Sequence, residues 1–367
     1  MLNLICKTSL LKSVLLLLII IGTTTLPGCS EKEEPVIPVT PPVVETKTLK
    51  EKAKFPIGAA VTVAHLKEAD FANAFKSNYN QLSAEYEMKM KGIWTSLTGY
   101  SFDNTDYLVN FAIQNNMKVH GHALLWYSSF PDWFKTAAFD SLNFENNVKT
   151  YIQTVVSRYK GKIVSWDVAN EIFADDGTLR VESTVYKTFK DPIAFYGRCF
   201  QYARNADPDV KLFYNDYDQV LNSAKRISVS KMVERFKKAG YPIDGIGDQF
   251  HTTIWTSKTT ISSGLTDIAR TGLLIHISEL DIRVNQNKSD SYVFTDAEMI
   301  KQSDMYKSIV ESFESLPQAQ KFAITTWGIT DKYTWLTGWW HPKEYPLLFN
   351  SNYTKKKAYD GFLSGLK

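Results

Sequence analysis

Strand-like and helix-like segments alternate from about residue 52 to the end of this chain of 367 residues. Short apolar runs bounded by turn residues predict strands, and apolar residues at helical spacing predict helices. The expected strands lie at 57–61, 79–83, 118–124, 163–168, 211–214, 244–250, 273–282 and 321–327. The expected helices lie at 64–76, 103–116, 143–160, 191–206, 224–239, 265–271, 295–315 and 355–366.

Eight strand–helix pairs in one continuous domain predict an α/β fold, the (β/α)8 TIM barrel, over residues 52–367. A doubly wound open sheet is the alternative. No Gly-x-Gly-x-x-Gly pattern follows the first strand, so a dinucleotide site has no support in the sequence.

Polar residues stand at the carboxyl ends of seven of the eight predicted strands, where a barrel collects its catalytic groups. Two of them are glutamates, Glu171 after the fourth strand and Glu279 at the end of the seventh. A pair of carboxylates is what glycoside hydrolysis requires, one as acid and one as base or nucleophile. The other strand-end residues are Glu85, Lys89, His120, His122, Trp126, Asn170, Asn215, Asp216, Gln249, His251, Asp281, Trp327, Asp331 and Trp335. A single Glu at such a position is more often a solvated loop residue, and a single His more often a core contact, but the set favours a sugar-binding cleft.

Composition and motifs exclude several other classes. The formal charge of +3 without a Lys/Arg cluster does not favour nucleic-acid binding. Nine Trp and nineteen Tyr suit stacking on sugar faces, and they suit a core equally well. No metal motif occurs, and although His120 and His122 could chelate, alternate strand residues also share a face for packing. No Gly-x-Ser-x-Gly elbow is present, and Cys199 fits a buried position in a helix.

The first 51 residues read as a targeting segment and a tether. Lys7 and Lys12 precede an apolar run that is too short for an ordinary membrane span, which predicts a signal peptide over residues 1–28. Leu26-Pro-Gly-Cys29 resembles a bacterial lipobox, so we expect cleavage before Cys29 and lipidation of its thiol. A plain secretory peptide is the alternative. Residues 29–51, rich in Pro, Val, Thr and Glu, predict an extended tether. The acidic run after Cys29 resembles a surface-export signal, so we expect a lipid-anchored protein of the outer membrane or cell surface.

Five motifs between residues 52 and 367 resemble glycoside hydrolase family 10, whose members are mostly endo-β-1,4-xylanases with a (β/α)8 fold. They are Gly121-His-Ala-Leu-Leu-Trp126, Trp166-Asp-Val-Ala-Asn-Glu171, Gly245-Ile-Gly-Asp-Gln-Phe-His251, Ile277-Ser-Glu-Leu-Asp-Ile282 and Thr326-Trp-Gly-Ile-Thr-Asp331. They occur in the family's order at plausible spacings. The resemblance implies a retaining hydrolase of xylan that needs no cofactor or metal and acts as a monomer.

The resemblance also implies a role for each site residue. Glu171 is expected to be the general acid/base, with its pKa raised by a poorly solvated site, and Glu279 the ionised nucleophile roughly 5–5.5 Å away. His251 is expected to donate to Glu279, Asp281 to fix the tautomer of His251, and Asn170 to donate to the sugar 2-OH. Residues matching the subsite at the cleaved bond are Lys89, His122, Trp126, Gln249, Trp327 and Trp335. Glu85 matches the next subsite toward the non-reducing end.

Two departures from the family pattern fall in that outer glycone subsite. Glu85 is followed by Tyr86 where the family usually has Asn, and Ser129 stands where the family usually has Gln. The resemblance therefore predicts intact chemistry with a less certain substrate. A decorated or mixed-linkage xylan fits the change, and another β-glycan such as cellulose or mixed-linkage glucan remains open. A non-catalytic glycan-binding lipoprotein is the third hypothesis, and the presence of both glutamates disfavours it.

Overall fold

The computed structural model describes residues 47–367. The predicted signal peptide, Cys29 and nearly all of the predicted tether lie outside the described residues. Within them, the short helix α1 (Leu49–Lys52) already contributes the buried Leu49, so ordered structure starts before residue 52, the boundary expected from the sequence. No helix of residues 47–367 combines the length and the apolar character that a membrane span requires.

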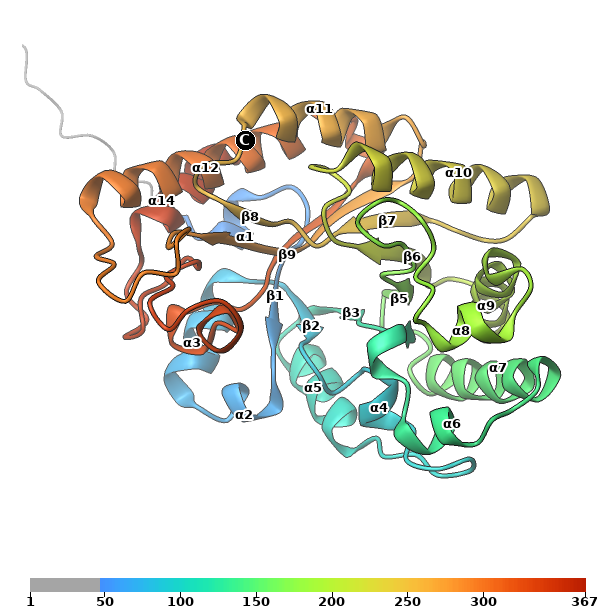
Figure 1. The fold of residues 1–367 in the computed structure, drawn as a ribbon. Coiled ribbons are helices and arrows are strands. Elements are labelled where there is room, and N and C mark those ends of the chain that lie inside the picture. The colour runs from blue at the N-terminus through green and yellow to red at the C-terminus, as the bar shows by residue number, and fades with distance from the viewer. Residues whose placement is uncertain (1–46) are drawn as a thin grey trace, which may run out of the picture. The chain divides into compact units, whose positions relative to one another are not determined.

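Eight parallel strands close into a barrel, as the sequence predicts, because β10 pairs with both β1 and β9 (Figure 1). Every other strand of the barrel pairs in parallel with its two neighbours. The strands are β1 (Ile57–Val61), β2 (Gln81–Ala84), β3 (Lys118–Gly121), β5 (Ser165–Asn170), β6 (Lys211–Asp216), β7 (Gly245–Asp248), β9 (Leu274–Arg283) and β10 (Lys321–Thr326).

One long helix follows each strand on the outside of the barrel (Figure 1). These helices are α3 (Ala69–Asn78), α5 (Asp103–Gln114), α7 (Ser141–Arg158), α9 (Pro192–Ala206), α10 (Ser223–Ala239), α11 (Lys258–Ala269), α12 (Asp296–Glu314) and α14 (Lys357–Gly365). Shorter helices lie in the connections: α2 (Val63–Leu66), α4 (Met90–Ile93), α6 (Asp132–Thr136), α8 (Thr184–Thr188) and α13 (Leu336–Trp339).

The predicted helix boundaries fail where polar residues hide the helical spacing. Helix α11 begins at Lys258, not near 265, because its first turn is polar and its N-cap is Ser257. The stretch predicted as one helix over 64–76 is two, α2 and α3, which are separated at Lys67 and Glu68. By contrast, the capping box of Thr295 and Glu298 starts α12 as its sequence predicts.

The third strand ends earlier than expected, and this difference shapes the site. It stops at Gly121, and the chain then forms a second short strand, β4 (Leu125–Trp126), which pairs with β5. The register sets Trp126 opposite Asn170, immediately before Glu171. The break therefore places an aromatic side chain of one strand beside the carboxylate of the next.

Aromatic and polar rings fill the interior of the barrel below the site. The rings of His120 on β3 and His276 on β9 are 4.6 Å apart, although these two strands are not neighbours. Such a contact has to cross the barrel interior. His120 also bonds Ser165 and lies against Asp167, so it is a buried packing residue and not part of the cleft.

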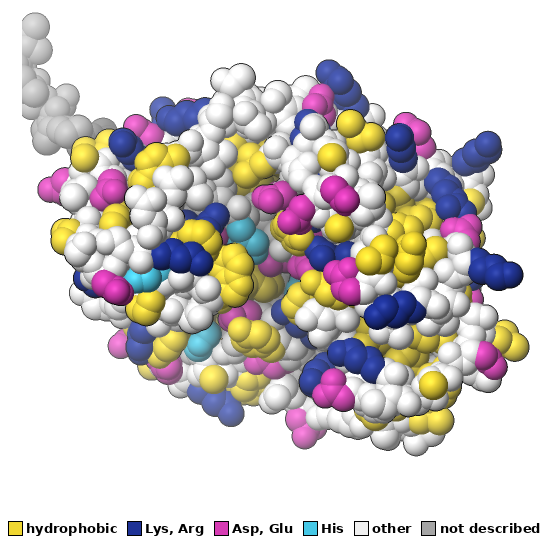
Figure 2. All heavy atoms as spheres, viewed as in Figure 1, with side chains coloured by type: hydrophobic (Ala, Val, Ile, Leu, Met, Phe, Trp, Pro, Cys, Tyr) yellow, Lys and Arg dark blue, Asp and Glu magenta, His cyan; other side chains and the backbone are white. Residues whose placement is uncertain are grey.

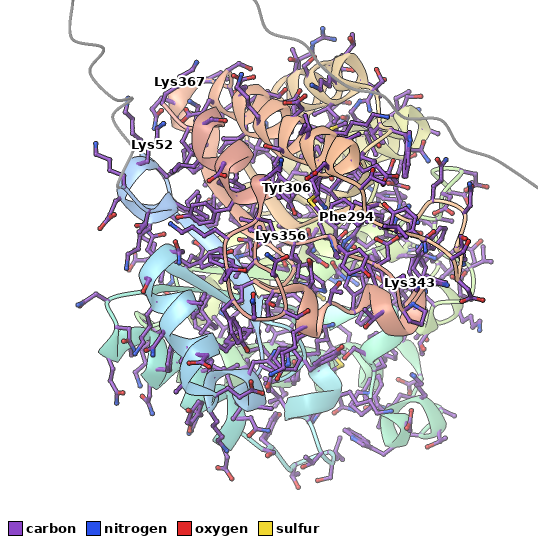
Figure 3. The ribbon with its side chains drawn as sticks, turned by 90° about the vertical axis from the view of Figure 1, so that its left-hand side faces the viewer. Lys52, Phe294, Tyr306, Lys343, Lys356 and Lys367 are labelled. Carbon is purple, nitrogen blue, oxygen red and sulfur yellow. The ribbon has the colours of Figure 1, made fainter. Side chains whose placement is uncertain are left out.

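Two acidic strand-end residues are also removed from the cleft by ion pairs with lysines. Asp331 binds Lys356 at 2.7 Å, and Asp216 binds Lys225 at 2.7 Å, with all four side chains buried. Figure 3 shows Lys356 on the side of α12 and α14, near Phe294, whose ring lies 5.3 Å from the ammonium. The sequence groups both aspartates with the site residues, but the tertiary structure gives them a structural role.

Candidate active site

A cleft of about 620 Å³ opens at the carboxyl ends of the barrel strands. Figure 2 shows His and acidic side chains beside apolar ones in the hollow at the centre of this face. Its lining includes every residue that the sequence assigns to catalysis or to substrate binding: Glu85, Lys89, His122, Trp126, Asn170, Glu171, Gln249, His251, Glu279, Trp327 and Trp335. Asp281 is completely buried behind them.

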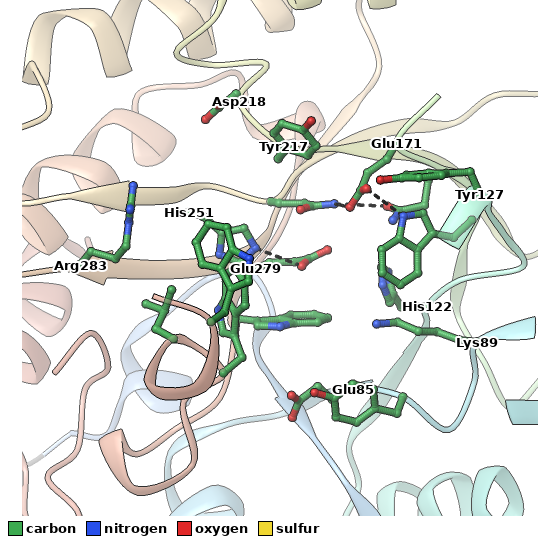
Figure 4. Close-up of a pocket in the computed structure, with 18 of the residues that line it drawn as sticks. Glu85, Lys89, His122, Tyr127, Glu171, Tyr217, Asp218, His251, Glu279 and Arg283 are labelled. Carbon is green, nitrogen blue, oxygen red and sulfur yellow. Dashed lines mark hydrogen bonds and ion pairs between the residues drawn. The ribbon is translucent and has the colours of Figure 1, made fainter. Parts of the chain in front are cut away.

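Glu279 lies in the cleft beside His251 (Figure 4), and its carboxylate receives two donors. Nε2 of His251 approaches Oε2 at 3.3 Å, and Nδ2 of Asn215 donates to Oε1 at 2.9 Å. Burial alone would raise the pKa of Glu279, but the hydrogen bond from His251 and the nearby positive charges, that of Lys89 included, outweigh it and lower the pKa. Glu279 is therefore ionised at neutral pH, as a nucleophile has to be.

His251 stands between two carboxylates, which determine its charge. Its Nδ1 lies 2.9 Å from Oδ2 of Asp281, and the same oxygen accepts a hydrogen bond from Nε1 of Trp335 at 2.8 Å. Burial opposes the imidazolium, but Asp281 and Glu279 together raise the pKa of His251 to about 10. The ring is thus a charged donor to Glu279, and Asp281 fixes its orientation.

Because the native pKa of His251 lies above its value of about 6.5 in an unfolded chain, protonation stabilises the fold. This contribution is complete below pH 6.5 and is lost as the pH rises to about 10. We expect the free energy of unfolding of the wild type to exceed that of His251→Gln by an amount that shrinks across this window, by ~2 kcal/mol or more. Urea unfolding of both proteins at several pH values measures it, and parallel pH profiles would contradict the assignment of a charged His251.

Glu171 receives a different pair of donors on the other wall of the cleft. Nε1 of Trp126 donates to Oε2 at 2.8 Å, and Nε2 of Gln249 donates to Oε1 at 2.9 Å. Its backbone has φ +56°, a left-handed conformation that costs a non-glycine residue on the order of 1 kcal/mol or more. The direction of the carboxyl group therefore depends on contacts that hold this backbone in place.

A hydrogen-bond chain joins the two glutamates. Oδ1 of Asn170 accepts from Gln249 at 3.4 Å and from Asn215 at 2.9 Å, and these two amides also donate to Glu171 and Glu279 respectively. Because Oδ1 of Asn170 already accepts two hydrogen bonds, its Nδ2 is the atom that can donate to a sugar hydroxyl. The expected separation of the two carboxyl groups and the protonated starting state of Glu171 stay predictions.

Asn215 is the site residue whose role the sequence reasoning missed. Oγ of Ser278 donates to its Oδ1 at 2.6 Å, which directs Nδ2 to Glu279 and Asn170. Its position at the end of β6 was the available signal, since the strand-end rule includes it. Other lining residues come from loops, short helical turns and the last position of β9, where the sequence has no comparable pattern: Tyr127, Asp175, Tyr217, Asp218, Arg283, Leu336 and Trp339.

Arg180 clamps the strained backbone of Glu171 from the loop after β5. Its Nε donates to the carbonyl of Glu171 at 3.0 Å, and its guanidinium lies 4.6 Å from the ring of Tyr127. A further bond joins it to the hydroxyl of Tyr217. Two other hydrogen bonds complete the support: Glu171 N–H donates to the carbonyl of Asn215, and the next N–H, of Ile172, donates to Tyr214.

Arg180→Lys keeps the charge but loses the guanidinium, whose separate N–H groups reach both the Glu171 carbonyl and the Tyr217 hydroxyl. We expect kcat on a polysaccharide substrate to fall about 10- to 100-fold, because a small displacement of a catalytic group is that costly, while KM changes little. The loss should be smaller on an aryl glycoside whose leaving group needs no proton. Arg158→Lys, at a pair on the outer surface with Asp106, is the matched control. Equal losses on both substrates would mean that Arg180 does not act through Glu171.

The two residues that depart from the family pattern, Tyr86 and Ser129, lie in different surroundings. Tyr86 is 57% exposed and lines the cleft, and Nζ of Lys89 lies 5.1 Å from its ring. Ser129 is buried, and its Oγ accepts from the backbone N–H of Lys91 at 3.3 Å, so it supports α4 and does not line the cleft. Beside Tyr86, burial raises the pKa of Glu85, which favours its role as a hydrogen-bonding group toward neutral ligands.

Within residues 47–367, no cluster of three or more His, Cys, Asp or Glu side chains has the geometry to hold a metal ion. His120 and His122 both face Asp167, whose Oδ2 lies 3.0 Å and 2.8 Å from their ring nitrogens. This buried carboxylate accounts for the alternate histidines that the sequence shows as a possible chelate.

Comparisons with known proteins show which family this chain is similar to. The model of glycosyl hydrolase family 10 matches residues 46–364. A β-1,4-xylanase of Dictyoglomus thermophilum is 34% identical over 95% of this chain and 97% of its own length. An endo-β-1,4-xylanase of Cellvibrio japonicus is 36% identical over 85% of this chain, which spans 56% of that relative. An exoglucanase of Acetivibrio thermocellus is 35% identical over 84% of this chain, which spans 28% of it.

Solved structures show the same fold. A xylanase 10C mutant from Cellvibrio japonicus in complex with xylopentaose superposes with a TM-score of 0.83 at 35% identity, covering 88% of this chain and 69% of that one. Xylanase 10B from Thermotoga maritima superposes with a TM-score of 0.80 at 32% identity, covering 87% and 98%. The barrel, the cleft and the matched sequence together place the chain in a family: it belongs to glycosyl hydrolase family 10.

Proposed function

We propose that this chain is a retaining endo-β-1,4-xylanase. The observation that supports it most is the pair Glu171 and Glu279, set in one cleft and joined through Gln249, Asn170 and Asn215. Family membership and the xylanase relatives add support. Two carboxylates supply both the proton and the nucleophile, so no cofactor enters the reaction.

The reaction takes two steps at these groups. Glu171 donates its proton to the glycosidic oxygen while a carboxylate oxygen of Glu279 attacks the anomeric carbon, and the leaving sugar departs as an alcohol. Glu171, now a carboxylate, takes a proton from water, whose oxygen attacks the same carbon and releases Glu279. Each step inverts that carbon, so the β-configuration is retained overall.

The neighbouring residues prepare these steps. His251 and Asn215 hold Glu279 ionised and oriented, with donors in place before the substrate arrives. The cleft has lining residues on both sides of the pair, with Glu85 on one side and Tyr217 and Asp218 on the other (Figure 4). A cleft that can hold the polysaccharide on both sides of the cleaved bond fits endo action.

A product profile tests the proposal. The purified protein is incubated with xylan, cellulose and mixed-linkage β-glucan, and the released reducing ends and oligosaccharides are identified. We expect short xylo-oligosaccharides from xylan, with β-configured products at early times. An absence of new reducing ends from every polysaccharide would favour the non-catalytic glycan-binding alternative.

A different β-glycan is the second candidate substrate, and Tyr86 is the observation that favours it. This exposed ring stands where the family usually has an Asn in the outer glycone subsite, and one relative is named an exoglucanase. Release of cello-oligosaccharides at a rate above that of xylo-oligosaccharides would support this candidate.

We also propose that the protein is a monomeric lipoprotein, anchored through Cys29 at the outer membrane or cell surface. The lipobox-like Leu26-Pro-Gly-Cys29 and the acidic run that follows support the anchor. Labelling with a radioactive fatty acid tests it, since Cys29→Ala should abolish incorporation. Protease treatment of whole cells then tests exposure at the surface.

A further inference from the structure

Arg283 is a charged side chain in the cleft for which the proposed reaction has no use. It follows Ile282 at the end of β9, four residues after Glu279, and lines the cleft together with Asp218. Figure 4 places it across Glu279 from Lys89. Since Lys89 matches the subsite at the cleaved bond and Glu85 the next one toward the non-reducing end, this position points to the reducing-end side for Arg283.

The guanidinium of Arg283 is held by stacking and not by an acceptor. It lies 4.1 Å from the ring of Trp340, whose Nε1 donates to the carbonyl of Asn285 at 2.9 Å and is thereby fixed. Among residues 47–367, no carboxylate lies within ion-pair distance of Arg283, and no hydrogen bond from it to the protein is present. Its donors are thus oriented but unused.

The nearby acidic groups of the described residues form no ion pair with this arginine. Both oxygens of the buried Glu344 accept backbone N–H groups, from Val284 and Asn285, each at 2.9 Å. Burial raises the pKa of Asp218, and the charge of Arg283 acts on Asp218 and on Glu344 without an ion pair to either. Asp290 is exposed and lies 3.1 Å from His341.

A second cation reinforces the positive charge at the same aromatic ring. Nζ of Lys288 lies 3.9 Å from the centre of Trp340. Beside it, the 61% exposed Trp339 stacks on Trp335 at 4.8 Å, which continues the aromatic surface from the cleft outward. This group of Arg283, Lys288, Trp339 and Trp340, the Trp340 platform, joins apolar sugar-stacking surface to two cations.

We propose that the Trp340 platform binds an acidic sugar substituent, a uronic acid branch on the polysaccharide, on the reducing-end side of the cleaved bond. A planar guanidinium matches a carboxylate with two parallel hydrogen bonds, and the exposed indole supports the sugar ring. The inference rests on the proposed xylanase function and adds the substituent that the cleft selects. Attraction between the two cations and a negatively charged substrate also predicts a higher kcat/KM for acidic substrates, and added salt should reduce this advantage.

Two xylo-oligosaccharides of equal backbone length test it, one unbranched and one with a single uronic acid branch, together with the carboxyl-reduced form of the latter. In the full-length wild type, kcat/KM should be higher for the acidic substrate than for its reduced form, and salt should diminish the difference. Arg283→Gln should lower kcat/KM about tenfold on the acidic substrate and little on the unbranched one. Arg283→Lys should lose less on the acidic substrate than Arg283→Gln. Arg270→Gln, at the exposed C-cap of α11, is the matched control.

The outcomes separate the two proposals. Equal losses by Arg283→Gln on all three substrates would mean that Arg283 binds backbone hydroxyls, which overturns the acidic-branch proposal and leaves the xylanase proposal intact. No cleavage of the unbranched substrate by the wild type would refute the xylanase proposal itself. Thermal melting of each variant shows whether it is folded, and Lys288→Gln, on an exposed loop, should weaken the preference for the acidic substrate by a smaller factor without changing the fold.

Discussion

Glu279→Gln should abolish hydrolysis of xylan while leaving the protein folded. The amide has the shape of the carboxylate but cannot attack the anomeric carbon, so kcat should fall by roughly 10⁴-fold or more, as when other enzymes lose a nucleophile. The cleft should still bind substrate, because the lining residues on both sides of Glu279 are unchanged. Reducing-end release measures the loss, and binding of xylo-oligosaccharides by calorimetry shows that the site persists.

Glu311→Gln is the matched control for this variant. Glu311 lies on the outer helix α12 with a half-exposed side chain, 3.4 Å from Lys307, and its loss should leave the rate unchanged. Thermal unfolding of Glu279→Gln should remain cooperative. If that variant kept a rate within tenfold of the wild type, another group would have to be the nucleophile.

Glu171→Ala should produce a loss that depends on the leaving group. On xylan the departing sugar alcohol needs a proton, and removal of the general acid should lower kcat by about 10²- to 10⁴-fold. On a nitrophenyl xylobioside the leaving group departs without protonation, so glycosylation of Glu279 should be far less affected. A burst of nitrophenol followed by slow turnover is the expected signature, because Glu171 also acts as the base in the second step.

Azide distinguishes a retaining mechanism in the same variant. The small anion can occupy the space vacated by the carboxylate beside Trp126 and Gln249 and attack the glycosyl-enzyme without a base. Turnover of the nitrophenyl substrate should rise with azide, and the product should be a β-configured glycosyl azide. An α-configured product would mean a single displacement and an inverting enzyme, against the assignment of Glu279 as nucleophile.

The fold could be predicted from the sequence because the patterns that indicate its strands and helices are local. Eight strands with periodic helices between them predict the closed barrel, and β10 does pair with both β1 and β9. Boundaries failed where local signals compete. The polar first turn of α11 hid its start, and the third strand ends at Gly121 although the sequence predicts it to continue to Leu124.

The residues of the site could be predicted from the sequence for a related reason. Parallel strands in a barrel end at one face, so Glu171, Gln249 and Glu279 had to converge wherever the strands closed. The same rule wrongly included Asp216 and Asp331, because it places a Cα atom and says nothing of the direction of the side chain. Each of these aspartates instead binds a buried lysine from a helix or loop that no strand pattern reveals.

The sequence by itself determined the barrel, the pair of glutamates and most residues around them, since strand order and strand-end chemistry are written in consecutive residues. Only the tertiary structure decided how those residues act on one another. It directed the amide of Asn215 to Glu279, set Arg180 on the carbonyl of Glu171, turned Ser129 away from the cleft and left Arg283 on Trp340 with unused donors. These contacts depend on loop paths and side-chain directions, which are fixed by packing between segments distant in sequence.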